Sequence, residues 1–215
     1  MLEVFEYPNT TWWIIGFVVG AVIAYLLGSV NFGIIISKAK FKDDIRKHGS
    51  GNAGMTNMMR TYGKAAAGMT LFGDCMKAII AVIIGTMLNG DMGGYVAGLF
   101  CIVGHVYPLY FKFKGGKGVA TAAAMLLLLN PIVFLILLII FVIIVGFTKY
   151  LSLGSVMCMI VYPLILNRFM GEPNYIITII SLLITVFILF MHRENIKRLL
   201  AGTESKFSFK KSDKK

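Results

Sequence analysis

The chain has 215 residues, of which 58% are hydrophobic and only 14% are charged, and its mean hydropathy is +0.81. Soluble domains rarely sustain such long uncharged runs, so the composition excludes an ordinary soluble protein and predicts an all-α integral membrane protein. The net charge of +11 does not favour nucleic acid as a partner, because the cations flank apolar runs and form no basic stripe with exposed aromatic residues.

Six apolar stretches approach the roughly 20 residues that cross about 30 Å of hydrocarbon. They are residues 12–36, 66–88, 92–111, 131–148, 151–170 and 174–191. A seventh stretch, residues 118–129, is short and covers about 18 Å as a helix. Asn130-Pro131 predicts a break after it, because proline removes a helix hydrogen bond. We therefore predict seven transmembrane helices, of which the short one is either a full pass or a re-entrant limb.

The distribution of cations predicts the orientation. With the N-terminus outside, 19 of the 21 lysines and arginines fall on the inner side, as the positive-inside rule requires. Joining residues 118–148 into one helix would place the basic C-terminal end outside, which the rule disfavours. We expect one transmembrane domain over residues 1–204, followed by a basic, mobile cytoplasmic tail over residues 205–215.

The first polar cluster is residues 48–60, called here the glycine loop. It combines glycines with hydroxyl and amide side chains, and it ends at Arg60. Backbone N–H groups at glycines and a bidentate guanidinium both suit a phosphate group. The loop therefore predicts a phosphate site beside the membrane.

The second cluster is residues 114–121, which opens the short helix, and its first four residues, Lys114–Lys117, are called here the lysine turn. The N–H groups of Gly115 and Gly116, two lysines and a helix N-terminus would together attract an anion. The alternative is a flexible loop whose lysines snorkel to the membrane surface. The spacing is not that of a Walker P-loop.

The third cluster is residues 192–198, which closes the last apolar stretch. Together with the residues up to Glu204 it is called here the terminal motif. Within it, His192 and Asn195 stand three residues apart on one helix face, and Arg198 continues that face. The alternative is an ordinary polar anchor at the interface. Ser155 either packs within its helix or supplies one more donor to the site.

Charged residues within apolar stretches should face other protein groups. Asp74 and Lys77 are three residues apart and predict a structural ion pair, whereas His105 suits either a core or a site-lining position. The sequence has no H-E-x-x-H zinc spacing and no H-x4-D acyltransferase pattern. We predict no metal site and no cofactor.

The three clusters together resemble the bacterial acyl-phosphate:glycerol-3-phosphate acyltransferase family, the PlsY type. Residues 49–60 match its pattern G-S-G-N-x-G-x-T-N-x-x-R, residues 114–121 match K-G-G-K-x-x-A-T, and residues 192–204 match H-x-x-N-I-x-R-L-x-x-G-x-E. The likeness covers residues 26–204. Asn31 departs from the proline or threonine expected there.

This resemblance implies a multi-pass protein of the bacterial cell membrane with its active site on the cytoplasmic side. It implies transfer of a fatty acyl group from acyl phosphate to glycerol 3-phosphate, giving lysophosphatidic acid and phosphate. A soluble enzyme that makes acyl phosphate is implied as a partner, along with membrane lipid. The alternative from the residues alone is a transporter or binding protein for phosphate or an organophosphate.

The resemblance also implies the site residues. The catalytic residues would be Ser50, Arg60, Lys117, His192 and Asn195. The substrate-binding residues would be Asn52, Thr56, Asn57, Lys114, Gly115, Gly116, Ser155 and Arg198. The base that takes the proton of the 1-hydroxyl is either His192 or an oxygen of the acyl phosphate.

Overall fold

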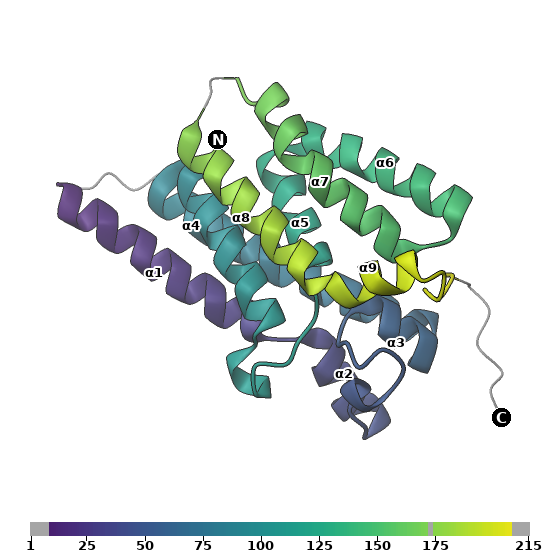
Figure 1. Ribbon diagram of the computed structural model, residues 1–215. Coiled ribbons are helices and arrows are strands. Elements are labelled where there is room, and N and C mark those ends of the chain that lie inside the picture. Colours follow the sequence, from purple (N-terminus) through teal and green to yellow (C-terminus); the bar gives the residue numbers. More distant parts are fainter. Residues whose placement is uncertain (1–8, 172–173, 208–215) are drawn as a thin grey trace. The chain divides into compact units, whose positions relative to one another are not determined.

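The structure is a computed structural model that describes residues 9–171 and 174–207. Those residues form α-helices, short 3₁₀ turns and loops, and contain no strand (Figure 1). The chain divides into two compact units, one ending at Leu129 and one beginning at Asn130. Each unit is described by itself. The all-helical architecture predicted from the composition is confirmed.

The first apolar stretch, predicted over residues 12–36, lies within the candidate span Thr10–Phe41 and is built of two helices, α1 (Thr10–Ser29) and α2 (Phe32–Phe41). The break lies at Val30 and Asn31, which both have extended backbone. The side chain of Asn31 accepts the N–H of Ile34 at 3.2 Å, which starts the second helix. The polar Asn31 therefore serves as a helix cap.

After the 3₁₀ turn η1 (Ile45–Lys47) and helix α3 (Met55–Tyr62), the chain enters α4 (Lys64–Val106). Asn89 and Gly90 within α4 have non-helical backbone. Lys77 and His105 would be about 42 Å apart along a straight helix, yet Lys77 Nζ lies 3.0 Å from His105 Nδ1. The helix is therefore a hairpin with limbs over residues 64–88 and 91–106, which confirms two of the predicted apolar segments.

Small residues let these helices approach closely. A Cβ on Gly28 of α1 would overlap the backbone of Cys101, and one on Gly104 would overlap the carbonyl of Tyr25. Such contacts are typical of helix pairs inside membranes, where packing replaces the hydrophobic effect. They join α1 to the second limb of α4.

The first unit ends with the 3₁₀ turn η2 (Leu109–Phe111), the lysine turn and helix α5 (Val119–Leu129). Helix α5 has 11 residues, a length of about 16 Å. It packs against α4, where Gly94 accommodates Leu129 and Gly98 accommodates Met125. The predicted short segment is confirmed as a separate helix.

The second unit contains α6 (Pro131–Thr148), α7 (Leu151–Phe169), α8 (Tyr175–Met191) and α9 (Arg193–Leu200). Asn130 accepts the N–H of Val133 at 3.4 Å, and Pro131 occupies the first turn of α6. This local chemistry explains why the predicted break lies there. Residues 208–215, most of the predicted tail, lie outside the described residues, whereas the N–H of Phe207 donates to the carbonyl of Lys149 at 2.6 Å.

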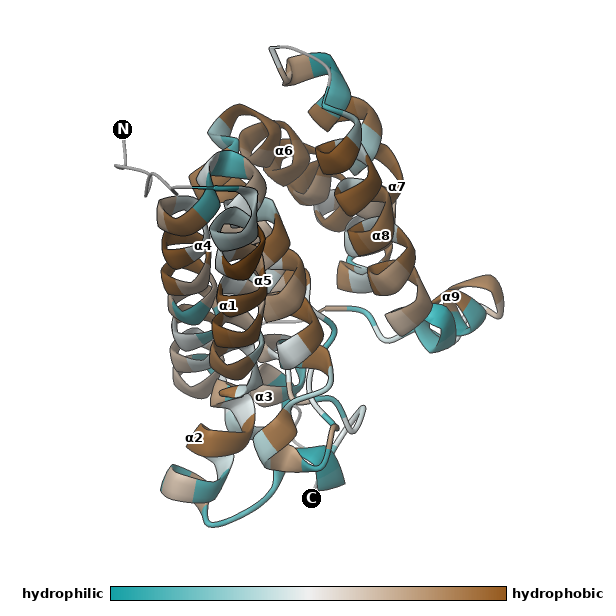
Figure 2. Cartoon of the chain, turned by 90° about the vertical axis from the view of Figure 1, so that its left-hand side faces the viewer, coloured by the Kyte–Doolittle hydropathy of each residue, from teal (hydrophilic) through white to brown (hydrophobic). Residues whose placement is uncertain are grey.

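Long apolar helices dominate both units. By length and composition, Thr10–Phe41, Lys64–Phe111, Pro131–Thr148 and Leu151–Phe169 can cross a membrane, and α8 with α9 is a fifth candidate bent by 58°. Many large apolar side chains on α1 and α6 are exposed, among them Trp12, Val18, Ile139 and Val142. Figure 2 shows hydrophobic residues along these helices and hydrophilic residues around α2 and in α9. The protein is therefore an integral membrane protein with polar chemistry at helix ends.

Candidate active site

The glycine loop is held from inside by Asn57. This residue is 2% exposed, and its Nδ2 lies 2.9 Å from the carbonyls of His48 and Asn52 and 3.2 Å from that of Ile45. Its Oδ1 accepts the N–H of Ser50 at 3.1 Å. The backbone of the glycine loop is therefore wrapped around the buried side-chain amide of Asn57.

The loop needs glycine at two positions. Gly49 and Gly51 have φ of 54° and 70°, in the left-handed region that glycine adopts at low cost. Asn52 Oδ1 accepts the N–H of Gly54 at 2.9 Å. Asn52 and Asn57, both predicted to bind substrate, thus make contacts that shape the loop. Their roles toward substrate stay predictions.

The other predicted loop residues face outward. Ser50 and Arg60 are exposed, and Thr56 is half-buried in the first turn of α3. Arg60 lies in the last turn of the same helix. The loop therefore presents one hydroxyl and one guanidinium from opposite ends of a rigid segment.

The lysine turn uses its backbone N–H groups within the protein. The N–H of Gly115 donates to the carbonyl of Val106 and that of Gly116 to the carbonyl of His105, both at 3.0 Å. A Cβ on Gly116 would overlap the ring of His105, and one on Gly115 would overlap the His105 carbonyl. In this structure the two glycines therefore permit close approach to α4, and the predicted supply of two N–H groups to an anion is not what they provide.

The two lysines of this turn differ in exposure: Lys114 is exposed and Lys117 is half-buried. Gly118, with φ of 85°, comes directly before α5. Lys117 therefore lies two residues before the first residue of α5, where the helix dipole adds positive potential.

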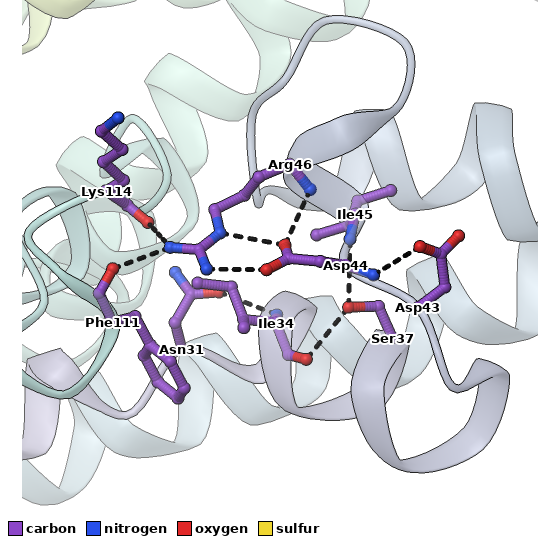
Figure 3. Close-up of polar contacts among 9 residues, drawn as sticks. All are labelled: Asn31, Ile34, Ser37, Asp43, Asp44, Ile45, Arg46, Phe111 and Lys114. Carbon is purple, nitrogen blue, oxygen red and sulfur yellow. Dashed lines mark hydrogen bonds and ion pairs between the residues drawn. The ribbon is translucent and has the colours of Figure 1, made fainter.

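Direct contacts join the glycine loop to the lysine turn. The N–H of Ala53 donates to the carbonyl of Gly115 at 3.4 Å. Arg46 Nη1 donates to the carbonyls of Phe111 at 2.7 Å and Lys114 at 3.2 Å (Figure 3). Two sequence clusters that are about 60 residues apart are thus neighbours in space.

Arg46 itself is fixed by a carboxylate. Its Nε and Nη2 donate to the two oxygens of Asp44 at 2.9 and 2.7 Å. This hydrogen-bonded pairing lowers the pKa of Asp44 to about 2, against the opposing effect of partial burial. The same Asp44 side chain caps η1 by accepting the N–H of Arg46 at 3.1 Å.

A second carboxylate, Asp43, lies on the other side of the loop. Its Oδ2 accepts the hydroxyl of Tyr62 at 3.0 Å and lies 2.5 Å from His48 Nε2. The backbone hydrogen bond from Asp44, together with Tyr62 and His48, lowers the pKa of Asp43. Burial next to this carboxylate raises the pKa of Tyr62 to about 12, so the phenol stays neutral and donates.

The predicted ion pair of Asp74 and Lys77 is confirmed, with Lys77 Nζ 2.8 Å from Asp74 Oδ1. Lys77 also donates to the carbonyls of Gly28 and Val30, at 2.9 and 2.8 Å, where α1 ends. His105 completes the cluster, and all three side chains are buried. Because the His105 ring lies against Gly116, this core cluster also supports the lysine turn.

The terminal motif lies in the second unit and is organised by Glu204. His192 sits at the bend between α8 and α9, and its Nδ1 lies 2.8 Å from the carbonyl of Ile188. Glu204 accepts hydrogen bonds of 2.7 Å from Asn195, Arg198 and Ser152. These three donors outweigh the effect of burial and lower the pKa of Glu204.

Ser155 is buried and its hydroxyl donates to the carbonyl of Leu151 at 3.0 Å, one helical turn earlier. This is the common arrangement of a serine inside a helix. Its predicted role as an extra donor to substrate stays a prediction.

Two organising residues were missed in the sequence. Arg46 lies just before the glycine loop, and Glu204 closes the terminal motif; each pairs a charge with several partners. The available signals were the D-I-R run at residues 44–46 and the final glutamate of the third pattern. Neither signal reveals which carbonyls or side chains the charge contacts.

Taken together, the apolar helices and the basic, glycine-containing loops define an integral membrane protein built to handle an anionic group. The family model described as glycerol-3-phosphate acyltransferase matches residues 18–202. The chain belongs to this glycerol-3-phosphate acyltransferase family, which confirms the resemblance drawn from the three patterns.

Curated relatives named glycerol-3-phosphate acyltransferase cover most of the chain. The protein of Thermoanaerobacter pseudethanolicus is 43% identical over 193 residues, covering 90% of this chain and 96% of the relative. The protein of Bacillus subtilis is 40% identical over 185 residues, covering 86% of this chain and 94% of the relative.

Two crystal structures of PlsY (YgiH), an integral membrane glycerol 3-phosphate acyltransferase, are also similar. The glycerol 3-phosphate form is 37% identical with a TM-score of 0.84, covering 89% of this chain and 96% of that one. The lysophosphatidic acid form is 36% identical with a TM-score of 0.80, covering 90% and 96%.

Proposed function

We propose that this protein transfers a fatty acyl group from acyl phosphate to the 1-hydroxyl of glycerol 3-phosphate, giving lysophosphatidic acid and inorganic phosphate. The observation that carries the proposal is the likeness to PlsY over nine-tenths of the chain, in forms with the acceptor glycerol 3-phosphate and with the product lysophosphatidic acid. The complete match of residues 49–60 and 114–121 to the family patterns supports it.

The chemistry of the loops favours a donor that carries phosphate. Acyl phosphate is already activated, because inorganic phosphate is a good leaving group. An enzyme that uses it needs chiefly to position two anionic substrates and to stabilise developing charge. The guanidinium of Arg60 and the ammonium groups of Lys114 and Lys117 suit that task, and no metal or coenzyme is needed.

The family resemblance carries the assignment of roles, and the chemistry of each side chain suits it. Arg60 and Lys117 would bind phosphate oxygens, and Ser50 would orient one of them by a hydrogen bond. Thr56 and Lys114 would add binding contacts, while Asn52 and Asn57 hold the loop that carries Ser50.

The resemblance also implies substrate roles for three residues of the terminal motif, His192, Asn195 and Arg198. Because His192 Nδ1 lies 2.8 Å from the Ile188 carbonyl, the proton of the neutral ring belongs on Nδ1. Nε2 then carries the lone pair, so His192 has the tautomer that a base or a hydrogen-bond acceptor requires. The acyl phosphate oxygen is the competing base.

The proposed setting is the bacterial cell membrane, with seven transmembrane segments, the N-terminus outside and the site on the cytoplasmic side. The cation distribution supports this orientation, because 19 of the 21 lysines and arginines then lie inside. Residues 1–204 would act as one catalytic domain. The family resemblance implies a soluble enzyme that forms acyl phosphate as the partner.

The test uses the purified full-length protein in detergent or lipid. Acyl phosphate and glycerol 3-phosphate should give lysophosphatidic acid and one equivalent of phosphate. Turnover with acyl-CoA in place of acyl phosphate would overturn the donor assignment. Absence of product with either donor, from protein that remains folded, would overturn the proposed function.

A further inference from the structure

Arg46 stands between two predicted parts of the site without belonging to either family pattern. It precedes the glycine loop by two residues, and its guanidinium contacts the carbonyl of Phe111, before the lysine turn, and that of Lys114, the first residue of the turn (Figure 3). It is the side chain that links the segment before the glycine loop to the segment that carries Lys114.

The backbone between the two carbonyls that Arg46 contacts has an energetically unfavourable conformation. Lys112 and Phe113, which lie between the two bonded carbonyls, have φ of 58° and 56°. Non-glycine residues adopt this left-handed conformation only when their surroundings compensate for it. Nη1 of Arg46 donates to the carbonyls of Phe111 and Lys114, which lie on either side of this pair of residues. These two hydrogen bonds supply the compensation.

Arg46 has little capacity left for a substrate. A guanidinium has five N–H donors, and here Nε and Nη2 bond Asp44 while Nη1 bonds two carbonyls. The side chain is 20% exposed, and Asp44 fixes its plane. Arg46 therefore acts on chemistry through the turn that it holds, and a lysine could not reproduce the planar fork.

We propose that Arg46 is a positioning residue for acyl transfer: its guanidinium holds the lysine turn against the glycine loop and so sets where Lys114 and Lys117 meet a phosphate group. The proposal rests on the proposed function. The Ala53–Gly115 backbone hydrogen bond is the second tie between the same segments, so loss of Arg46 should displace the turn without releasing it.

The decisive variant is the double substitution Asp44→Asn with Arg46→Gln. It removes both charges, so no carboxylate is left unpaired and the fold is retained. We expect KM for at least one of the two phosphate-bearing substrates to rise about 10- to 100-fold, the scale of a misplaced positioning group. Arg46→Lys should give an intermediate rise. Lys47→Gln removes a neighbouring exposed cation and should leave both KM values within about twofold.

KM separates positioning from simple stability. A purely structural role would lower the active fraction, and hence the apparent kcat, while leaving both KM values unchanged. Unchanged KM values in the double variant would therefore overturn the proposal, as would an equal rise in Lys47→Gln. If wild-type protein makes no lysophosphatidic acid, the proposed function fails and this proposal fails with it. If the wild type turns over and the double variant keeps both KM values, only the role of Arg46 fails.

Discussion

Lys77 Nζ lies 3.0 Å from His105 Nδ1, although the two residues are 28 positions apart in one long helical segment. The contact closes the α4 hairpin and brings the end of its second limb beside the lysine turn. Asp74 and the carbonyls of Gly28 and Val30 surround the same ammonium group. One buried cation thus ties together α1, both limbs of α4 and, through His105, the turn that carries four predicted site residues.

Lys77→Met should destabilise the protein by about 3–5 kcal/mol, because it leaves the buried Asp74 carboxylate without its cation. Thermal or denaturant unfolding in detergent measures this loss. The control is Lys40→Met, an exposed lysine on α2, which should change stability by no more than about 0.5 kcal/mol. Adding Asp74→Asn to Lys77→Met should recover part of the loss, and no recovery would contradict the ion-pair explanation.

Gly116→Ala should lower stability by about 1–3 kcal/mol and reduce kcat/KM, because the new methyl group overlaps the His105 ring. Unfolding midpoints and steady-state kinetics measure both effects. Gly68→Ala is the matched control: no atom lies within 4 Å of its Cβ position, so stability should stay equal or rise by up to about 1 kcal/mol. Equal behaviour of the two variants would argue against a close approach at Gly116.

Ser50→Ala and Asn57→Ala should separate a substrate contact from a loop support. Ser50 is exposed, so its loss should reduce kcat/KM by about tenfold or more while changing stability by less than about 0.5 kcal/mol. Asn57→Ala should cost about 1–3 kcal/mol of stability, because buried carbonyls lose their donor. Parallel measurements of unfolding and turnover on both variants test this division, which fails if Asn57→Ala leaves stability intact.

The ionisation of Glu204 should make the stability of the folded protein depend on pH. Its pKa is lowered in the folded protein relative to the ordinary value of 4.5, so its stabilising contribution is complete above that pH and is lost as the pH falls through the lowered value. Glu204→Gln should therefore be less stable near pH 7 and should lose less stability on acidification. Unfolding midpoints between pH 3 and pH 7 show this, with the exposed Glu194→Gln expected to follow the wild type.

Asp44 should contribute to the same acid transition, because its pKa is about 2 in the folded protein, below its ordinary value of 3.8. Its stabilising contribution is complete above the ordinary value and is lost as the pH falls toward about 2.

His192→Ala should retain a pH–rate profile of the wild-type form. Acyl phosphate carries its own basic oxygens beside the reacting carbonyl, so the substrate can accept the proton of the 1-hydroxyl. We expect a loss in kcat smaller than the roughly 10²–10⁴-fold that removal of a general base causes. A larger loss, together with disappearance of the acidic limb of the wild-type pH–rate profile, would identify His192 as the base.

Several elements follow from local chemistry and were predicted correctly. The break at Asn130-Pro131 follows from a proline that ends one helix and starts the next, and the separate apolar segments over residues 66–88 and 92–111 follow from the length needed to cross the hydrocarbon layer. The ion pair of Asp74 and Lys77 follows from helical spacing alone. The break at Asn31 was missed, because an apolar run hides a single capping residue.

The sequence by itself determined that this is a helical membrane protein with three polar motifs of one acyltransferase family, because apolar length and residue order are local properties of the chain. The tertiary structure alone decided what those polar groups contact. It placed Asn57 inside its loop and paired the N–H groups of Gly115 and Gly116 with α4 carbonyls. It also paired Arg46 with the carbonyl of Lys114, 68 residues away in the lysine turn. Hydrogen-bond partners of that kind depend on chain reversal and packing, which bring together groups whose distance in sequence carries no signal.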